Sequence, residues 1–359
     1  MKSKKLFREL LLTWHRKKNK RVMPWKGEKD PYKVWLSEII LQQTRVEQGL
    51  PYYEKFIRQY PTITHLANAR EEDVFKLWEG LGYYTRCRNL LSTARIVAEN
   101  YAGSFPSDYD SIIKLKGIGA YTASAVASFC FNLPHAVVDG NVLRVLSRFF
   151  GIYLPVDSAE GKKIFAQLAQ ECLDKDQPGE YNQSIMDFGA TVCKPVPVCK
   201  QCPLNKKCMA FNSCTVTDLP VKQKKIVKKE RWFSYFIFSF NDEAYVQLRR
   251  EKDIWQNLYE FYLKETATDP EWNAGKIKNW LELELKIDAI QNITILSAKK
   301  QLLTHQVIHG YFICVSIGQK PLFNLQKGLW LNSAEIKTKA FPKFIHQFTG
   351  KETLQTQLL

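Results

Sequence analysis

The sequence predicts an all-helical domain over residues 1–215 followed by an α+β domain over residues 233–359. A chain of 359 residues is long enough for two or three domains at roughly 150 residues each. Helix-length segments separated by short turns fill the first part, whereas aromatic-rich, strand-like segments dominate the second. Four closely spaced cysteines end the helical part. The two parts therefore differ in secondary structure and in chemistry.

The predicted helices of the first domain are bounded by Pro, Gly or Asp turn signals. Asp30-Pro31 is typical of a helix start, because Asp caps a helix and Pro suits its first position. The predicted helices cover residues 6–16, 32–48, 51–60, 71–79, 85–100, 107–114, 120–131 and 160–173.

The second domain follows a basic linker predicted at residues 216–232. Its part from Lys222 to Arg231 contains six Lys or Arg residues against a single Glu. Strands are predicted at residues 232–240, 245–249 and 311–317, and a helix is predicted near residues 274–285. This mixture predicts the α+β class.

Charge and composition narrow the class of partner. Lys and Arg number 52 against 36 Asp and Glu, which gives a net charge of +16. Such an excess favours a polyanion, nucleic acid first and an acidic membrane surface second. No segment reaches the roughly 18 apolar residues of a membrane span, and the amino terminus lacks a secretory signal. We therefore expect a cytoplasmic protein whose cysteines are ligands or buried thiols rather than disulfides.

The cysteine motif predicts a metal centre. Cys193, Cys199, Cys202 and Cys208 are spaced Cys-x5-Cys-x2-Cys-x5-Cys. Thiolates at this density select zinc or an iron–sulfur cluster. Structural zinc usually uses two Cys-x2-Cys hooks, and this motif contains one. The spacing favours a [4Fe–4S] cluster, with zinc as the alternative.

Two carboxylates are candidate catalytic groups. Glu38 lies in an almost continuous apolar run, where burial would raise its pKa and let it hold a proton near neutral pH. Asp139 precedes a predicted helix, and its ordinary interpretation is an N-cap. The helix dipole and free amides there favour the ionised form. One neutral acid and one anion are the pair needed to cleave a glycosidic bond.

A glycine turn is a candidate phosphate-binding element. Leu115-Lys116-Gly117-Ile118-Gly119 lies between two predicted helices. Free backbone amides at the start of the second helix can bind a phosphate, although a plain connector is the ordinary alternative. The turn is similar to the helix–hairpin–helix of DNA repair proteins.

These motifs occur in the order seen in the adenine DNA glycosylases, a branch of the helix–hairpin–helix glycosylase superfamily. The motifs are Leu36-Ser37-Glu38-Ile39-Ile40-Leu41-Gln42-Gln43-Thr44, Gly80-Leu81-Gly82-Tyr83-Tyr84, the glycine turn, Val138-Asp139-Gly140-Asn141 and the four cysteines. The resemblance covers residues 24–215 closely. It implies a helical glycosylase domain with a [4Fe–4S] module. The implied activity is excision of adenine opposite 8-oxoguanine or guanine in double-stranded DNA.

The second domain resembles the Nudix-like domain of the same family. The resemblance is carried by Ile254-Trp255-Gln256-Asn257-Leu258-Tyr259-Glu260-Phe261 and by Leu303-Thr304-His305. The resemblance implies that Thr304 and His305 approach 8-oxoguanine. The ordinary interpretation of these two residues is an exposed turn between strands. The resemblance also implies a monomer that acts on nucleoid DNA in a bacterial cytoplasm.

The resemblance assigns a role to each catalytic residue. Glu38 would protonate adenine N7, and Asp139 would stabilise the sugar cation or trap it covalently. Asn141 and Tyr121 would orient groups around the same site.

The remaining residues that match the family would bind DNA. Gln43 and Tyr83 would wedge into the base stack. The ordinary alternatives are that Gln43 is an exposed helix residue and that Tyr83 is a core aromatic. The other expected DNA contacts are Arg86, Lys116, Gly117 and Gly119.

The chain departs from the family pattern in four places. The first cysteine gap is five residues where six is usual, and Lys116 stands where such hairpins often have Pro. Leu303 replaces the commoner Phe, and Leu143 replaces a Lys found in some relatives. The shorter gap affects the conformation of the cysteine loop, and Leu303 affects the packing of its turn.

Three rival functions remain. A sibling glycosylase with lyase activity needs a Lys where this chain has Tyr121. A Nudix hydrolase needs a Glu-rich helix for Mg²⁺, and residues 275–288 contain Glu282 and Glu284 without such an array. A non-catalytic, zinc-bound DNA adaptor is the third.

Overall fold

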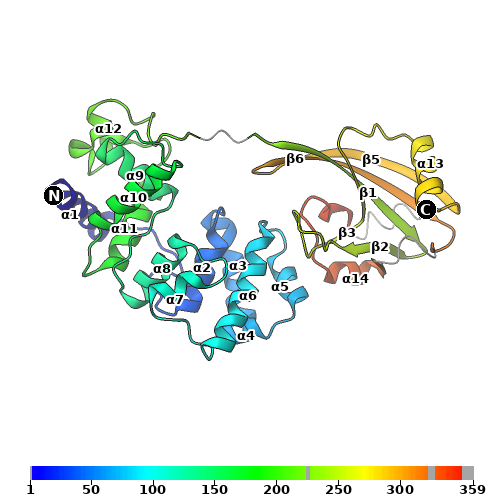
Figure 1. The fold of residues 1–359 in the computed structure, drawn as a ribbon, viewed down its shortest axis with the longest axis horizontal. Coiled ribbons are helices and arrows are strands. Elements are labelled where there is room, and N and C mark those ends of the chain that lie inside the picture. Colours follow the sequence, from blue (N-terminus) through cyan, green and yellow to red (C-terminus); the bar gives the residue numbers. More distant parts are fainter. Residues whose placement is uncertain (1, 224–226, 322–327, 350–359) are drawn as a thin grey trace. The chain divides into compact units, whose positions relative to one another are not determined.

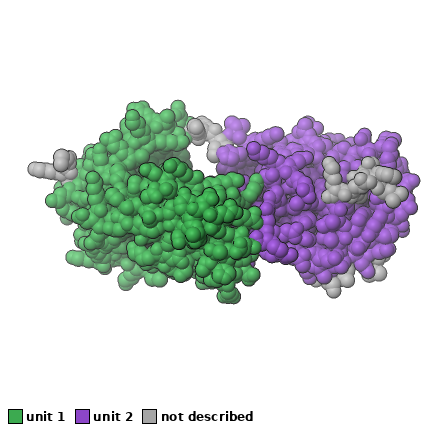
Figure 2. All heavy atoms as spheres, turned by 60° about the horizontal axis from the view of Figure 1, so that its bottom comes forward, with its two compact units in different colours: residues 1–68, 88–224 green, residues 69–87, 225–359 purple. Residues whose placement is uncertain are grey.

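The computed structural model describes residues 2–223, 227–321 and 328–349 (Figure 1). The chain forms two compact units: residues 1–68 with 88–224, and residues 69–87 with 225–359 (Figure 2). Positions 224–226 of the predicted basic linker lie outside the described residues. In the described ranges, no helix combines the length and the apolar character that crossing a membrane requires.

The part of the chain before residue 215 is helical, as predicted. Its helices are α1 (Lys2–Lys18), α2 (Pro31–Leu41), α3 (Val46–Gln59), α4 (Ile63–Ala67), α5 (Glu71–Trp78), α6 (Tyr84–Asn100), α7 (Tyr109–Lys114), α8 (Ala120–Phe131), α9 (Gly140–Phe150), α10 (Ala159–Cys172), α11 (Pro178–Thr191) and α12 (Met209–Asn212), with 3₁₀ turns η1 (Cys199–Gln201) and η2 (Asn205–Lys207). Asp30 caps α2 as expected, because its side chain accepts a hydrogen bond of 2.9 Å from the Tyr32 amide.

One predicted helix is wrong. Residues 32–48 form two helices, because α2 ends at Leu41 and α3 begins at Val46. Between them Gln43 adopts a φ of 58° and the Thr44 amide bonds back to the Leu41 carbonyl, which turns the chain. The break contains neither Gly nor Pro, so the sequence carries no warning of it.

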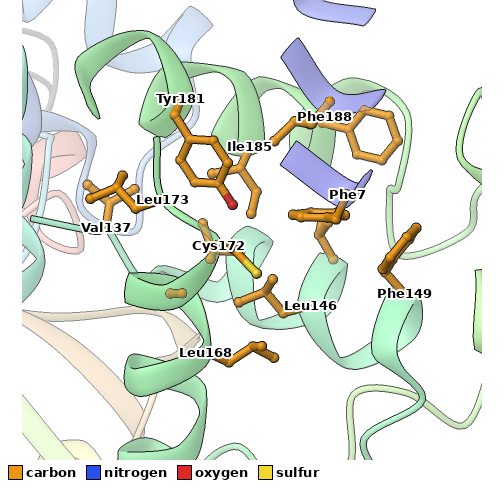
Figure 3. Close-up of a cluster of buried hydrophobic side chains, with 14 of the residues drawn as sticks. Phe7, Val137, Leu146, Phe149, Leu168, Cys172, Leu173, Tyr181, Ile185 and Phe188 are labelled. Carbon is orange, nitrogen blue, oxygen red and sulfur yellow. The ribbon is translucent and has the colours of Figure 1, made fainter. Parts of the chain in front are cut away.

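The core of the first unit anchors α9, the helix that follows Asp139. Figure 3 shows side chains from α1, α9, α10 and α11 that meet in one buried cluster. Phe7 and Phe149 lie with ring centroids 4.7 Å apart, and Phe188 meets Trp14 edge-on at 5.0 Å. Burying each such aromatic side chain stabilises the fold by about 1.5–3 kcal/mol. The start of α9 is therefore held by a rigid scaffold.

In its described residues, the second unit is built on a seven-stranded mixed sheet. The strands are β1 (Lys229–Phe240), β2 (Glu243–Leu248), β3 (Tyr259–Glu260), β4 (Tyr262–Thr266), β5 (Ile290–Leu302), β6 (Gln306–Ile317) and β7 (Gly328–Asn332). Their order is β3-β2-β1-β6-β5, with β4 beside β1 and β7 beside β2. The β1–β6 pair is parallel and the other pairs are antiparallel. Residues 229–232, predicted as linker, pair with Gln306–His309 and belong to β1.

Helices cover both faces of this sheet. Alternate residues of β1 point to opposite faces, so Phe233 and Phe236 lie in different buried clusters. On one face the sheet packs against α13 (Ala274–Glu284), and on the other against α14 (Ser333–Thr338) and η3 (His346–Phe348). The predicted α+β character is confirmed as a mixed sheet with helices on both faces.

Candidate active site and DNA-binding residues

Glu38 lies buried between two packed helices of the first unit. It projects from α2, and α8 supplies Tyr121, whose hydroxyl donates a hydrogen bond of 2.7 Å to Glu38 Oε2. Glu38 is 7% exposed. Burial raises its pKa to about 7; the Tyr121 hydrogen bond opposes this shift, and the charge of Asp139 adds to it. The carboxyl group can therefore hold a proton near neutral pH, as the sequence predicts.

Asp139 is both the N-cap of α9 and a member of the same site. Its Oδ1 accepts a hydrogen bond of 2.7 Å from the Val142 amide, and its Oδ2 accepts one of 2.9 Å from Asn141 Nδ2. Burial raises the pKa of Asp139, against these two hydrogen bonds and the charge of Arg144. The sequence-based expectation counted the helix start alone, and burial proves the larger effect. The hydrogen bonds nevertheless all favour the anion.

The four residues predicted to be catalytic line one cleft. Glu38, Tyr121, Asp139 and Asn141 share a cavity of about 800 Å³, and Gln43 lines its edge. This volume lies within the roughly 300–1,000 Å³ of typical ligand sites. The structure therefore brings together a carboxyl group that can carry a proton and one that is hydrogen-bonded as an acceptor.

The two predicted wedge residues share a strained backbone. Gln43 has a φ of 58° and Tyr83 a φ of 49°, in the left-handed region that non-glycine residues rarely adopt. Tyr83 is 47% exposed, so the alternative of a core aromatic is wrong. The Arg86 guanidinium lies 5.3 Å from the Tyr83 ring, and burial lowers the pKa of Arg86 to about 10. Gln43 lies between helices rather than on one, so its alternative is also wrong.

The glycine turn forms a tight hairpin between α7 and α8. The Ile118 amide bonds to the Leu115 carbonyl at 3.1 Å, and Gly117 has a φ of 78°. A Cβ at Gly117 would lie 2.6 Å from Asn89 Cβ, so a larger residue would clash there. Lys116, Gly117 and Gly119 are exposed, and a Cβ at Gly119 would meet nothing within 4 Å. The start of α8 is therefore open to an anion.

Thr304 and His305 form an exposed turn between β5 and β6. The turn is closed by a hydrogen bond of 2.8 Å from the Leu303 amide to the Gln306 carbonyl. Within the same unit, the Thr304 hydroxyl lies 3.0 Å from that of Tyr83. Two predicted DNA-contacting residues are thus in direct contact, which the sequence does not reveal.

A buried arginine of α9, Arg148, contacts the cysteine loop. Arg148 is 4% exposed, and its guanidinium lies 3.7 Å from Cys193 Sγ and 2.7 Å from the Lys194 carbonyl. Cys208 donates a hydrogen bond of 3.3 Å to the Arg148 carbonyl. Within the described ranges, no three His, Cys, Asp or Glu side chains are arranged to hold a metal ion. A thiol beside a buried cation, in a loop that carries three further cysteines, is nonetheless a donor set that suits a thiolate-ligated cluster.

Arg144 is a site residue that the sequence analysis missed. Its Nη2 donates hydrogen bonds of 2.8 Å to Asn141 Oδ1 and to the Gly189 carbonyl, and its Nε donates one of 2.8 Å to the Cys193 carbonyl. It therefore joins the Asp139 end of α9 to the cysteine loop. The available signal was a pair of arginines, Arg144 and Arg148, spaced by one turn on a largely apolar helix.

Asp187 is the second missed residue. It is fully buried on α11 and receives hydrogen bonds from Arg21 at 2.9 Å and Lys26 at 3.0 Å, two cations that line the cleft. Asn19 and Gln183 donate to the same carboxylate. A carboxylate between Met186 and Phe188 carries the same sequence signal as Glu38, so the pattern could have revealed it.

Known proteins resemble most of the chain, and others resemble its helical part alone. Residues 36–171 match the HhH-GPD superfamily base excision DNA repair proteins. The chain is 34% identical over 337 residues to the adenine DNA glycosylase of Buchnera aphidicola subsp. Baizongia pistaciae (strain Bp), covering 91% of each chain. It is 41% identical over 198 residues to the adenine DNA glycosylase of Homo sapiens, covering 53% of this chain and 36% of the human protein. A thermostable thymine-DNA glycosylase structure superposes with a TM-score of 0.55 at 29% identity, covering 59% of this chain and 98% of that one.

The similarity to the Buchnera protein extends through both units, and the superfamily match spans Glu38, the hairpin and Asp139. DNA is accordingly the partner that the basic composition indicates. The chain belongs to the adenine DNA glycosylase family and is a DNA glycosylase, a hydrolase of N-glycosyl bonds.

Proposed function

We propose that this enzyme excises adenine paired with 8-oxoguanine or guanine, as a monofunctional glycosylase of base-excision repair. The observation that carries the proposal is the pair of carboxyl groups in one cleft, Glu38 with a raised pKa and Asp139 at a helix start. Such a pair supplies a proton donor and a countercharge for cleavage of a glycosidic bond.

Glu38 supplies the proton. Adenine is a poor leaving group as an anion, so a proton must reach its ring nitrogen, N7, while the bond breaks. A carboxyl group with a pKa of about 7 is partly protonated at neutral pH and gives up its proton readily. The Tyr121 hydroxyl orients Glu38 by its 2.7 Å hydrogen bond and then stabilises the carboxylate that remains.

Asp139 faces the sugar. As the bond breaks, positive charge develops on the deoxyribose, and a preorganised anion stabilises it or captures it covalently. The Val142 amide and the Asn141 side chain fix both carboxylate oxygens. Arg144 holds Asn141 in turn, so the anion is kept in place by two successive hydrogen bonds.

In this proposal the enzyme binds the phosphate backbone of the DNA and takes one base out of the stack. The hairpin with Lys116, Gly117 and Gly119 offers amides and a cation to one phosphate, which positions the duplex without reading its sequence. The target adenine leaves the stack and enters the cleft. Gln43 and Tyr83, each held in a left-handed conformation, occupy the space that the base vacates.

We assign opposite-base recognition to the second domain. In this proposal residues 1–215 excise adenine, residues 216–232 connect the domains, and residues 233–359 form a Nudix-like domain. Thr304 and His305 read 8-oxoguanine from their exposed turn. The enzyme acts as a monomer on nucleoid DNA in a bacterial cytoplasm.

We also propose a [4Fe–4S] cluster held by Cys193, Cys199, Cys202 and Cys208. The cluster would cross-link the loop that follows α11 and so stabilise its structure. Arg148 and Arg144, which contact Cys193, connect that loop to the helix bearing the Asp139 cap.

The direct test is an excision assay on duplexes with adenine opposite 8-oxoguanine, guanine, cytosine or thymine, followed by alkali. We expect cleavage of the first two after alkali and no strand nicking without it. Nicking without alkali would favour the lyase sibling instead. The structure places the Tyr121 phenol, not an amine, beside Glu38, which favours simple hydrolysis.

A further inference from the structure

The guanidinium of Arg231 joins four segments of the second unit. Its Nε and Nη2 donate to Glu265 of β4 at 2.7 and 2.6 Å. Its Nη1 and Nη2 donate to Asp253, in the loop after β2, at 3.0 and 2.7 Å. The Nη1 group donates a further hydrogen bond of 3.0 Å to the Gln306 side chain. All five N–H donors of the guanidinium are therefore used.

Arg231 is the buried, positively charged centre of this cluster, whereas Asp253 and Glu265 remain partly exposed. The Arg231 side chain is 8% exposed, and its guanidinium lies 4.7 Å from the Phe233 ring. Burial alone would raise the pKa of Asp253, but hydrogen bonds from Arg231 and Arg249 hold it at about 2. Asp253 is therefore an anion at neutral pH, and its fork-to-fork contact with Arg231 is geometrically specific.

Gln306 connects the cluster to the exposed turn. It is the first residue of β6 and follows Thr304 and His305 directly. Its carbonyl closes the turn by accepting a hydrogen bond from the Leu303 amide. The Lys229 amide donates a hydrogen bond of 3.0 Å to the His305 carbonyl. The side chain of Gln306 is thus held from the core side while its backbone shapes the turn.

We propose that Arg231 is a positioning residue for opposite-base recognition. By donating to Gln306 while it is itself fixed by Asp253 and Glu265, it sets the conformation in which Thr304 and His305 are presented. This inference rests on the proposed role of the turn. It predicts that a residue without DNA contact controls the ratio of excision rates opposite 8-oxoguanine and guanine.

The test uses the full-length enzyme under single-turnover conditions. Arg231→Lys keeps the charge but replaces the planar fork by one ammonium group, which cannot hold both carboxylates and Gln306. Gln306→Met removes only the link to the turn. Each variant should lower the 8-oxoguanine-to-guanine rate ratio by about tenfold or more, the effect of losing one hydrogen bond from a charged donor. The rate opposite guanine and the thermal unfolding of Gln306→Met should stay at the parent values.

Arg249→Lys is the matched control. Arg249 is equally buried, pairs with Asp253 and Glu260, and also lies over Phe233, but its hydrogen bonds do not reach Gln306. Its substitution should leave the rate ratio unchanged. A loss equal to that of Arg231→Lys would mean that general disturbance of the cluster causes the effect, and would overturn the inference.

Thr304→Val separates this inference from the proposed function. If Thr304→Val lowers the ratio while Arg231→Lys and Gln306→Met do not, the turn reads the base and the inference about Arg231 is wrong. If Thr304→Val leaves the ratio unchanged, the proposed role of the turn is wrong and the inference falls with it. Support requires a lower ratio in all three variants.

Discussion

Replacing Glu38 by Gln should reduce activity and increase stability, with a pH dependence that identifies the cause. Gln keeps the size of the side chain and can still accept the Tyr121 hydrogen bond, but it cannot deliver a proton to adenine. General acid catalysis is typically worth 10²–10⁴-fold, so we expect a loss of excision in that range. Binding of the A·8-oxoguanine duplex should be largely retained.

The stability effect follows from the raised pKa. The pKa of Glu38 rises from an ordinary 4.5 to about 7, so the folded state binds the proton more tightly than the unfolded state does. Stability is therefore lost as pH rises from about 4.5 through about 7, and the loss amounts to about 3 kcal/mol at higher pH. Glu38→Gln does not titrate. It should match the parent at about pH 4 and be more stable at about pH 8.

Two measurements check this prediction. Single-turnover excision gives the catalytic loss, and chemical unfolding followed by circular dichroism at the two pH values gives the stability change. Excision within tenfold of the parent would show that Glu38 is not the acid. A stability difference that is the same at both pH values would show that the Glu38 carboxyl group does not change its pKa on folding.

Three further predictions concern Tyr121, Asp139 and the cysteine motif. Tyr121→Phe removes a hydrogen bond that lowers the pKa of Glu38, so the decline of excision at alkaline pH should move to higher pH. Tyr181→Phe, which removes a buried hydroxyl without a partner in the described part of the chain, should leave the pH profile unchanged. Asp139→Asn should lose about 10²–10³-fold in excision while the unfolding midpoint changes little, because Asn also caps helices. Cys199→Ser should reduce bound iron and brown colour in anaerobically purified protein, whereas Cys214→Ser, outside the motif, should not; stoichiometric zinc without iron in the parent would refute the cluster.

The fold could be predicted where local signals mark the elements. Capping at Asp30 and the turn signals place most of the helices, and the aromatic-rich run Trp232–Phe240 places β1. The strand β5 could not be predicted, because it lies at an edge of the sheet and is largely exposed, so its sequence lacks a period of two. The break at Gln43 is equally hidden, since a left-handed conformation of a Gln residue depends on its surroundings rather than on its own preference.

Two buried carboxylates show what a sequence pattern can and cannot predict about the candidate site. Glu38 and Asp187 are both carboxylates within apolar helical runs, and both are buried. Glu38 meets the neutral hydroxyl of Tyr121, so burial dominates and its proton is retained near pH 7. Asp187 meets the cations of Arg21 and Lys26, which lie 166 and 161 residues away in the chain, and therefore serves as an acceptor that anchors them. The pattern identifies buried acids, but the partners brought by the fold distinguish a carboxyl group that meets a neutral hydroxyl from one that meets two cations.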